Sequence, residues 1–431
     1  MKFKKYILIL VSLLLIFYAC EDRSDLTAPT PPNTGSADFT KFISIGNSLT
    51  AGVQNHALYE SAQNYSFGKL IANQVGVDYV QPTISDPGIG GKVEVASLEP
   101  FLTNIQPVDS GNPTNLKYQG IYNNLGIPGI VLADLDLTTT SPSQFSGRNP
   151  FIDIILRGQG KVIDLALTAK PTLITLWIGN NDILGYATSG GLGRYTQTQD
   201  FARLFDSLCA KLSQSGANVV IANIPNVTIM PFFTTVSNKL LQDSITAVFG
   251  KNSNNSITVM DLKQNLLTLR AQIELAQGKG TSSTNPLSNS VILDSEEIAI
   301  TQGVIKSYND NIRIIAKKYN FKLVDINQIF NEIAAKGKEG KTIDGVHVSA
   351  VYINGGLFSL DGIHPTSKGY GIIANAFIKV INKEFDAKIP LVNVATLPSG
   401  IDFYNNKKMN LNKQKLPIFP EGAFDNDNIL Y

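Results

Sequence analysis

The sequence predicts an α/β fold, with a parallel sheet covered by helices on both faces. Four short apolar, β-rich runs each end in polar or turn-forming residues: 42–45, 173–178, 219–224 and 321–326. Continuous apolar runs of this length are typical of strands buried on both faces. Helical periods accompany them, for example over residues 305–319 and 372–380. Strands that alternate with helices indicate a parallel sheet between two helical layers.

The composition is that of a globular protein without a strong charge. Of the 431 residues, 43% are hydrophobic and 16% are charged. The 36 Lys and Arg almost cancel the 35 Asp and Glu. No global field would attract nucleic acid or an anionic surface, so we expect no nucleic-acid partner. The sequence does not indicate an oligomeric state.

The N-terminus has the pattern of an export signal. Three lysines within Met1–Lys5 precede an almost wholly apolar run, Tyr6–Ala19, which is shorter than the roughly 20 residues of a bilayer span. Ala19 directly before Cys20 resembles a bacterial lipoprotein processing site, although Phe17 stands where an aliphatic residue is usual. We expect a signal peptide over residues 1–19 and lipidation of Cys20.

This resemblance implies an exported protein anchored to a membrane, and we expect the outer membrane, at its periplasmic face or at the cell surface. A simple secretory signal or an anchor helix is the alternative.

A single folded domain is expected over residues 39–395. Residues 20–38 contain Pro, Thr, Ser and Gly without an apolar period, which predicts a flexible tether. Two segments, near 81–120 and 228–300, do not fit the simple alternation of strands and helices. We interpret them as insertions in the domain. They form either a lid or cleft wall, or surface decoration. The role of the tail, 396–431, stays open.

Ser48 is the candidate nucleophile. The apolar run at 42–45 continues into Gly46-Asn47-Ser48-Leu49, small and turn-forming residues at a strand exit. Reactive groups gather at the carboxyl ends of strands in open parallel sheets. A serine in such a turn is more often a turn or cap residue, so other motifs must support the assignment.

A nucleophilic serine needs a base that a third group orients. The chain has three histidines, His56, His347 and His364. Asp361 and His364 share the short segment Asp-Gly-Ile-His-Pro-Thr before a helical pattern, so the carboxylate can reach one ring nitrogen and leave the other for Ser48. Asp344 and His347 repeat the Asp-Gly-aliphatic-His pattern without the following Pro-Thr and helix. We therefore favour His364, and give His56 no task.

Ester hydrolysis also needs donors for the developing oxyanion. Gly129, in the segment 123–129, offers a backbone amide that a substrate can approach closely. Asn181, in Gly179-Asn180-Asn181-Asp182, offers an uncharged side-chain donor. Gly129 can equally close a turn, and Asn181 can cap a helix.

These segments together resemble the ordered sequence blocks of the SGNH/GDSL hydrolases. The blocks are residues 46–49, 124–129, 179–182 and 361–365. The resemblance implies a three-layer, flavodoxin-like α/β/α sandwich and hydrolysis of lipid, carbohydrate or other small acyl esters. It further implies Ser48 as nucleophile, His364 as base and Asp361 as its orienting partner.

By the same resemblance, Ser48 N–H, Gly129 and Asn181 would form the oxyanion hole. Asn47 departs from the family pattern, which has Asp there, and loses a charge while keeping the hydrogen bonding.

Other chemistry is not indicated. The glycine clusters at 88–93 and 158–161 lack phosphate-loop spacing, and the three histidines and two cysteines show no metal-site spacing. Cys209 lies on a helical pattern and is expected to be a core residue. We expect no cofactor and no metal.

The sequence is compatible with three functions. The first is a serine hydrolase that cleaves carboxylic esters through an acyl-enzyme, with lipid and carbohydrate substrates both open. The second is a lipid-anchored ligand-binding protein on a catalytically silent hydrolase scaffold, which Asn47 keeps open. The third, a glycan-capturing lipoprotein, is disfavoured because the single tryptophan, Trp177, lies in a predicted core strand.

Overall fold

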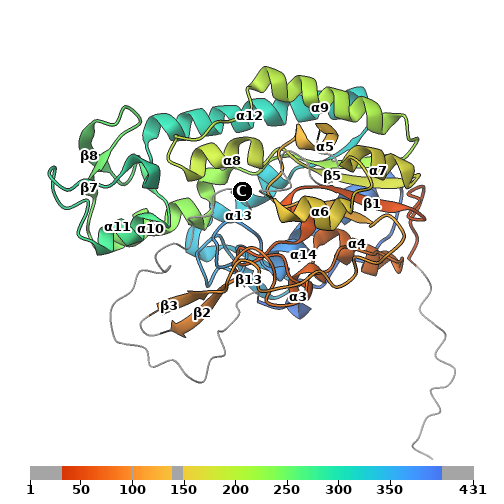
Figure 1. Ribbon diagram of the computed structural model, residues 1–431, viewed down its shortest axis with the longest axis horizontal. Helices are drawn as coiled ribbons and strands as arrows, with labels where there is room; N and C mark the ends of the chain where they lie inside the picture. Colours follow the sequence, from red (N-terminus) through yellow and green to blue (C-terminus); the bar gives the residue numbers. More distant parts are fainter. Residues whose placement is uncertain (1–31, 99–100, 138–148, 400–431) are drawn as a thin grey trace, which may run out of the picture. The chain divides into compact units, whose positions relative to one another are not determined.

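The structure is a computed structural model that describes residues 32–98, 101–137 and 149–399 (Figure 1). The predicted signal peptide, Cys20, most of the tether and the tail beyond residue 399 lie outside the described residues. The chain divides into two units, residues 1–32 and 33–431, and the description below concerns the second. Within the described ranges, none of the helices combines the length and apolarity that a bilayer crossing requires.

The domain is built on a five-stranded sheet in the order β11–β6–β5–β1–β4, and every neighbouring pair is parallel. The strands are β1 (Phe42–Gly46), β4 (Asn124–Gly126), β5 (Leu173–Trp177), β6 (Asn218–Ala222) and β11 (Lys322–Val324). All residues of β1 and β5 are buried, as expected for strands covered on both faces. Numbered along the chain, the sheet order is 2-1-3-4-5, the flavodoxin-like arrangement. The predicted α/β class is confirmed.

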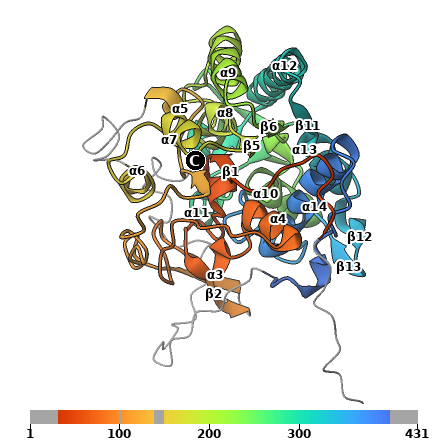
Figure 2. The ribbon, with the colours of Figure 1, turned by 90° about the vertical axis from the view of Figure 1, so that its right-hand side faces the viewer.

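Helices cover both faces of this sheet (Figures 1 and 2). On one face, Phe67 of α4 (Phe67–Val75) stacks on Phe377 of α14 (Ser367–Glu384) at 4.8 Å between centroids, and also meets Trp177 of β5. On the other face, Phe201 of α9 (Thr198–Ser213) stacks on Tyr308 of α12 (Ser295–Lys318) at 3.9 Å. The buried aromatic side chains therefore join each helical layer internally and to the sheet.

Side-chain caps define several of the helix starts. The Asp294 carboxylate and Glu297 form a reciprocal capping box at the start of α12, and Thr366 accepts from Gly369 N–H at the start of α14. The remaining α-helices are α2 (Ser48–Ala51), α3 (Glu60–Gln63), α5 (Asp134–Leu137), α6 (Pro150–Leu156), α7 (Val162–Thr168), α8 (Asn181–Thr188), α10 (Pro231–Gln242), α11 (Ala271–Ala276) and α13 (Ile326–Ala334).

Three strands end earlier than their apolar runs: β5 stops at Trp177, one residue early, and β6 and β11 each stop two residues early. β11 stops at Val324 because the Asp325 side chain accepts from Gln328 N–H and begins α13. β6 stops at Ala222, and the Asn223 side chain donates to Asp325 instead. Polar residues at the carboxyl ends thus turn the chain out of the sheet.

The folded body also begins earlier than the predicted start near Phe39. Asn33 forms a bridge with Lys388, and Ser36 N–H donates to the Phe385 carbonyl at 2.8 Å. Ala37 is buried. Residues 33–38 therefore pack along the end of α14, because their backbone groups find partners there.

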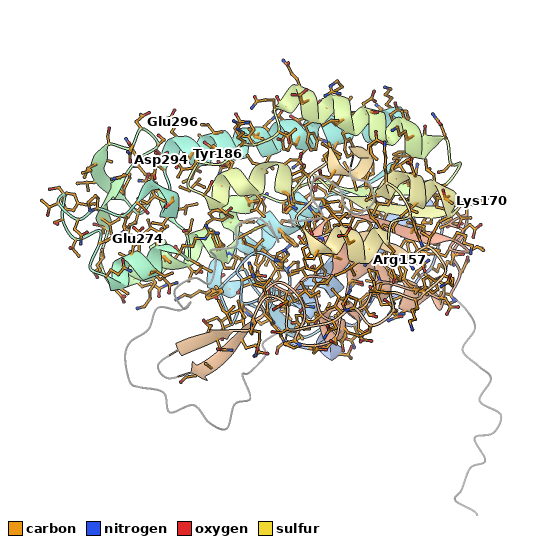
Figure 3. All side chains as sticks on the ribbon, in the orientation of Figure 1. Arg157, Lys170, Tyr186, Glu274, Asp294 and Glu296 are labelled. Atoms are coloured by element: carbon orange, nitrogen blue, oxygen red, sulfur yellow. The ribbon has the colours of Figure 1, made fainter. Side chains whose placement is uncertain are left out.

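Both predicted insertions contain small antiparallel sheets. The first includes β2 (Val93–Leu98) and β3 (Phe101–Ile105). The second insertion includes α10, α11 and two strand pairs. Figure 3 labels Glu274 and Asp294, which belong to this insertion. There, Glu274 accepts from Ser288, and Asp294 accepts from Ser253 N–H. The strand pairs are β7 (Ala247–Lys251) with β8 (Ile257–Asp261), and β9 (Leu266–Leu267) with β10 (Ile292–Leu293).

Candidate active site

The predicted nucleophile lies at the topological switch point of the sheet. Ser48 is the first residue of α2, directly after β1, and Asn181 is the first residue of α8, after β5. β1 and β5 are neighbours, but the chain proceeds from them toward opposite edges of the sheet. In open α/β sheets, ligands bind in the crevice that this divergence leaves at the carboxyl ends of the strands.

The structure brings Ser48, His364 and Asp361 into one hydrogen-bonded chain. Ser48 Oγ lies 3.0 Å from His364 Nε2, and His364 Nδ1 lies 2.8 Å from Asp361 Oδ2. The three residues are 3%, 1% and 0% exposed. The serine hydroxyl therefore has a base within proton-transfer distance, in a site from which most water is excluded.

The Asp361 carboxylate is held by four hydrogen bonds. Oδ1 accepts the backbone N–H groups of Ile363 and His364, and Oδ2 accepts His364 Nδ1–H and the backbone N–H of His56. Burial acts to raise the pKa of Asp361, but the attraction of His364 and these hydrogen bonds outweigh burial and lower the pKa from 3.8 to about 2. Asp361 is thus an ionised group that fixes the ring of His364 in one orientation.

His56, to which the sequence assigned no task, belongs to this site. It lies with Asn55 in a tight turn, at φ angles of 67° and 50°, and its backbone N–H donates to Asp361 Oδ2 at 2.7 Å. The Asn55 side chain accepts from Leu360 N–H at 2.9 Å. The turn is therefore hydrogen-bonded at two points to residues 360–364, the catalytic loop that carries Asp361 and His364. His56 takes part through its backbone N–H and not through its ring, so its residue type gives no signal of this role in the sequence.

The His56 ring is itself buried. Its Nδ1 lies 2.8 Å from the Gly90 carbonyl, which links the turn to the first insertion. Burial lowers the pKa of His56, although the charge of Asp361 acts to raise it. A neutral His56 therefore adds no positive charge beside the triad.

His347 lies elsewhere. It belongs to β13 (Val346–Val348), which pairs with β12 (Lys341–Ile343), and its side chain is exposed. Its Nε2 lies 2.9 Å from the Glu339 carbonyl. The structure thus brings His364, and not His347, to Ser48.

The two predicted oxyanion donors follow strands on either side of β1. Gly129 follows β4, and a φ of 83° permits its backbone to turn there without a side chain. Asn181 Nδ2 donates one hydrogen to the Ile130 carbonyl at 2.8 Å, which leaves its second amide hydrogen for a ligand. Asn181 is therefore bonded to the residue that follows Gly129, and both candidate donors lie beyond the carboxyl ends of strands that flank β1.

Asp182 is a further buried group that the sequence analysis left without a role. Its carboxylate accepts from Leu132 N–H at 2.9 Å and from Thr196 Oγ1 at 2.6 Å, which holds the loop after Gly129 against α8. Burial raises the pKa of Asp182 to about 6. Its position directly after Asn181 is the sequence signal that could have indicated this role.

Asn47 caps α2. Its Oδ1 accepts from Leu49 N–H at 3.1 Å, while its Nδ2 is buried and has no hydrogen-bond partner in the described part of the chain. An aspartate would offer a second acceptor in place of that donor. Asparagine in place of aspartate therefore changes the hydrogen bonding of the turn before α2. It does not change the side chains of Ser48, Asp361 and His364.

We find no arrangement for a metal within the described ranges, where no three or more His, Cys, Asp or Glu side chains are grouped to bind an ion. Cys209 is fully buried in α9, and burial raises the pKa of its thiol, so it packs as a core residue. Trp177 is also buried, with its indole N–H donating to the Asn223 carbonyl.

The sequence matches the model of the GDSL-like lipase/acylhydrolase family over residues 43–377. The chain therefore belongs to this family of carboxylic ester hydrolases. No curated protein sequence matches the chain.

Solved structures that resemble it include a lipase/acylhydrolase from Enterococcus faecalis, at 11% identity, with 81% of this chain and 98% of that chain covered and a TM-score of 0.35. The acetylxylan esterase Axe2 from Geobacillus stearothermophilus is 14% identical, with 82% and 98% covered and a TM-score of 0.37. LAE5, an α/β hydrolase enzyme from the metagenome of Lake Arreo, is 12% identical, with 80% and 96% covered and a TM-score of 0.37.

Proposed function

We propose that this protein is a serine hydrolase that cleaves carboxylic esters through an acyl-enzyme, with Ser48 as nucleophile, His364 as general base and Asp361 as its orienting partner. The observation that carries the proposal is the buried chain of hydrogen bonds from Ser48 Oγ through both ring nitrogens of His364 to Asp361, at 3.0 and 2.8 Å. Such a chain activates a hydroxyl that is otherwise a weak nucleophile.

In the proposed reaction, Ser48 Oγ attacks the ester carbonyl carbon while His364 Nε2 takes the hydroxyl proton. The oxyanion is stabilised by Ser48 N–H, Gly129 N–H and the free Asn181 amide hydrogen. His364 then passes its proton to the leaving alkoxide, and the C–O bond breaks to give the acyl-enzyme. Water, activated by His364 in the same way, hydrolyses the acyl-enzyme and releases the acid. These steps require no cofactor.

The proposal includes a location. We infer from residues 1–20 that the protein is exported, lipidated on Cys20 and held at the outer membrane. Mass spectrometry of the N-terminal peptide should find a diacylglyceryl-modified Cys20, and Cys20→Ala should release the protein from membranes. An unmodified N-terminus that begins at Met1 would overturn this part.

The second candidate is a ligand-binding protein on a silent scaffold. The observation that favours it is Asn47, whose buried Nδ2 finds no hydrogen-bond partner among the described residues, at a position where the family has an acidic residue. The triad side chains and their spacing do not distinguish a silent protein from an active one, so turnover must be measured.

Hydrolysis of p-nitrophenyl esters separates the two candidates. The purified protein should release p-nitrophenol with saturation kinetics. Asn181→Ala should lower kcat by about 10²–10³-fold, because one oxyanion donor is lost. Failure to hydrolyse esters of any chain length, or acetylated sugars, would leave the binding protein as the better account.

A further inference from the structure

Residues 54–57 form a tight turn whose two central residues have left-handed backbone conformations. Asn55 has a φ of 50° and His56 a φ of 67°, and the backbone groups of Gln54 and Ala57 pair across the turn at 3.1 and 3.0 Å. Residues other than glycine rarely adopt positive φ, and they keep it only where surrounding contacts fix the backbone. The contacts of this turn therefore indicate its role.

On one side, the turn is bonded to three consecutive residues, the last of which is the triad aspartate. Asn55 N–H donates to Ser359 Oγ at 2.9 Å, and the Asn55 side chain accepts from Leu360 N–H at 2.9 Å. His56 N–H donates to Asp361 Oδ2 at 2.7 Å. Two of these bonds use backbone N–H groups of the turn, so their directions depend on its φ and ψ angles.

On the other side, the turn is bonded to the first insertion. Val93 N–H donates to the Asn55 carbonyl at 2.8 Å, and His56 Nδ1 lies 2.8 Å from the Gly90 carbonyl. A carbonyl oxygen only accepts, so Nδ1 carries the hydrogen of this bond. Because His56 is buried, the loss of such a bond would be unfavourable. The imidazole of His56 thus connects the turn to the insertion.

Asp361 Oδ2 is the oxygen that orients the base. It lies 2.8 Å from His364 Nδ1, and in the described part of the chain its other hydrogen bond comes from His56 N–H. Oδ1 accepts from the N–H groups of Ile363 and His364, which belong to its own loop. The bond from His56 therefore restrains the carboxylate at the atom that contacts the imidazole. A displacement of about 1 Å at a catalytic site can lower the rate about 10²-fold.

We propose that His56 is a positioning residue for the triad. Its imidazole binds the first insertion at Gly90 and so holds the turn in the conformation in which His56 N–H fixes Asp361 Oδ2. The inference rests on the proposed ester hydrolysis. His56 acts through Asp361 and takes no proton in the reaction. The first insertion accordingly supports the catalytic loop from a distant part of the sequence.

The test removes the side-chain donor of His56 and then restores it. His56→Ala lacks the donor, whereas His56→Asn has an amide N–H at the position of Nδ1 and tolerates positive φ. Asn255→Ala is the matched control, because it creates the same backbone strain at a φ of 60° in the exposed turn between β7 and β8. His56→Ala should lower kcat for p-nitrophenyl acetate at least tenfold with KM within threefold. His56→Asn and Asn255→Ala should keep kcat within threefold of wild type.

A second variant and a second background separate positioning from packing. His56→Leu fills the space of the ring without a donor and should lower kcat as His56→Ala does, so a cavity is not the cause. In Asp361→Asn protein, His56→Ala should lower kcat by less than twofold, because the turn acts through this carboxylate. A tenfold loss in both backgrounds, or wild-type activity in His56→Leu, would overturn the inference.

A measurement without turnover keeps the inference distinct from the proposed function. The chain has three histidines, so in ¹⁵N-histidine-labelled protein the Nδ1–H signal of His364 can be identified by its loss in His364→Ala. This hydrogen should exchange with water at least tenfold faster in His56→Ala than in wild type or His56→Asn. Unchanged exchange and kcat in His56→Ala would overturn the inference even if esters are hydrolysed. Faster exchange in His56→Ala, with no ester hydrolysed by wild type, would support the positioning of Asp361 and overturn the proposed function instead.

Discussion

Two segments of this protein share the pattern Asp-Gly-aliphatic-His and have different structures. Residues 361–364 form a buried loop at the end of the sheet, and residues 344–347 form the turn of an exposed hairpin. In the hairpin, Asp344 and Gly345 occupy the two turn positions with φ angles of 50° and 78°. That arrangement is typical of an Asp-Gly hairpin turn between two strands.

The carboxylates also differ in what they bind. The Asp344 side chain accepts from the distant Val394 N–H, whereas Asp361 accepts from the N–H groups of its own loop and from the His364 ring. The residues that follow the pattern explain the difference. Val348 continues a strand paired with Lys341, while Pro365 and the cap Thr366 lead into α14. The pattern Asp-Gly-aliphatic-His alone therefore does not predict a catalytic pair. The residues that follow it must also be considered.

The largest contrast is expected between the two histidines. His364→Ala should lower kcat/KM for a p-nitrophenyl ester by about five orders of magnitude, because the serine loses its base. His347→Ala should stay within twofold of wild type, since its ring is exposed on β13 and hydrogen-bonds to the Glu339 carbonyl, away from Ser48. Steady-state kinetics on both variants check this, and a comparable loss in His347→Ala would contradict the assignment.

The two aspartates should differ next. Asp361→Asn keeps the size of the side chain but cannot orient and stabilise a protonated His364, and we expect kcat to fall by about 10³–10⁴-fold. Asp344→Asn should leave kcat within twofold. Equal effects from the two variants, measured on the same ester, would show that the charge at residue 361 is not used in the reaction.

The two glycines distinguish packing from turn geometry. Both have positive φ, so an alanine at either position costs about 1–2 kcal/mol in the free energy of unfolding. A Cβ at Gly345 meets nothing within 4 Å, but one at Gly362 lies 2.8 Å from Phe232 N. Urea denaturation should therefore give a loss of about 3 kcal/mol for Gly362→Ala and about 1 kcal/mol for Gly345→Ala. Equal losses would mean that α10 does not pack on the catalytic loop in solution.

The smallest expected effect is the dependence of stability on pH. Asp361 has a folded pKa of about 2, below its ordinary value of 3.8, so it contributes stability at pH values above 3.8 that is lost as the pH falls toward 2. The contribution is about 2 kcal/mol and should be missing in Asp361→Asn. Urea denaturation of both proteins between pH 6 and 2 measures it, and parallel pH profiles would contradict it.

The α/β class and the core strands could be predicted because apolar runs such as 42–45 and 173–178 are continuous. β4 could not, because it has three residues and begins with Asn124, whose side chain donates to the Thr50 carbonyl. The exact ends of β6 and β11 depend on contacts between Asn223 and Asp325, which are distant in sequence.

The candidate site divides in the same way. Residues at the exits of strands indicated Ser48, Gly129 and Asn181. Asp361 and His364 were indicated by the short segment that they share before a helical pattern. The hydrogen bonds of Asn55 and His56 to the catalytic loop could not be predicted, because they depend on a turn with positive φ angles at two non-glycine residues.

The central claim is that His364 activates Ser48 as a nucleophile, and labelling with a fluorophosphonate tests it most directly. Such a probe forms a covalent bond with an activated serine without the need to know the substrate. The account predicts one label per chain, found on Ser48 by peptide mass spectrometry, lost in Ser48→Ala and His364→Ala and retained in His347→Ala. A wild-type protein that takes no label, or one that is labelled equally well after His364→Ala, would contradict it.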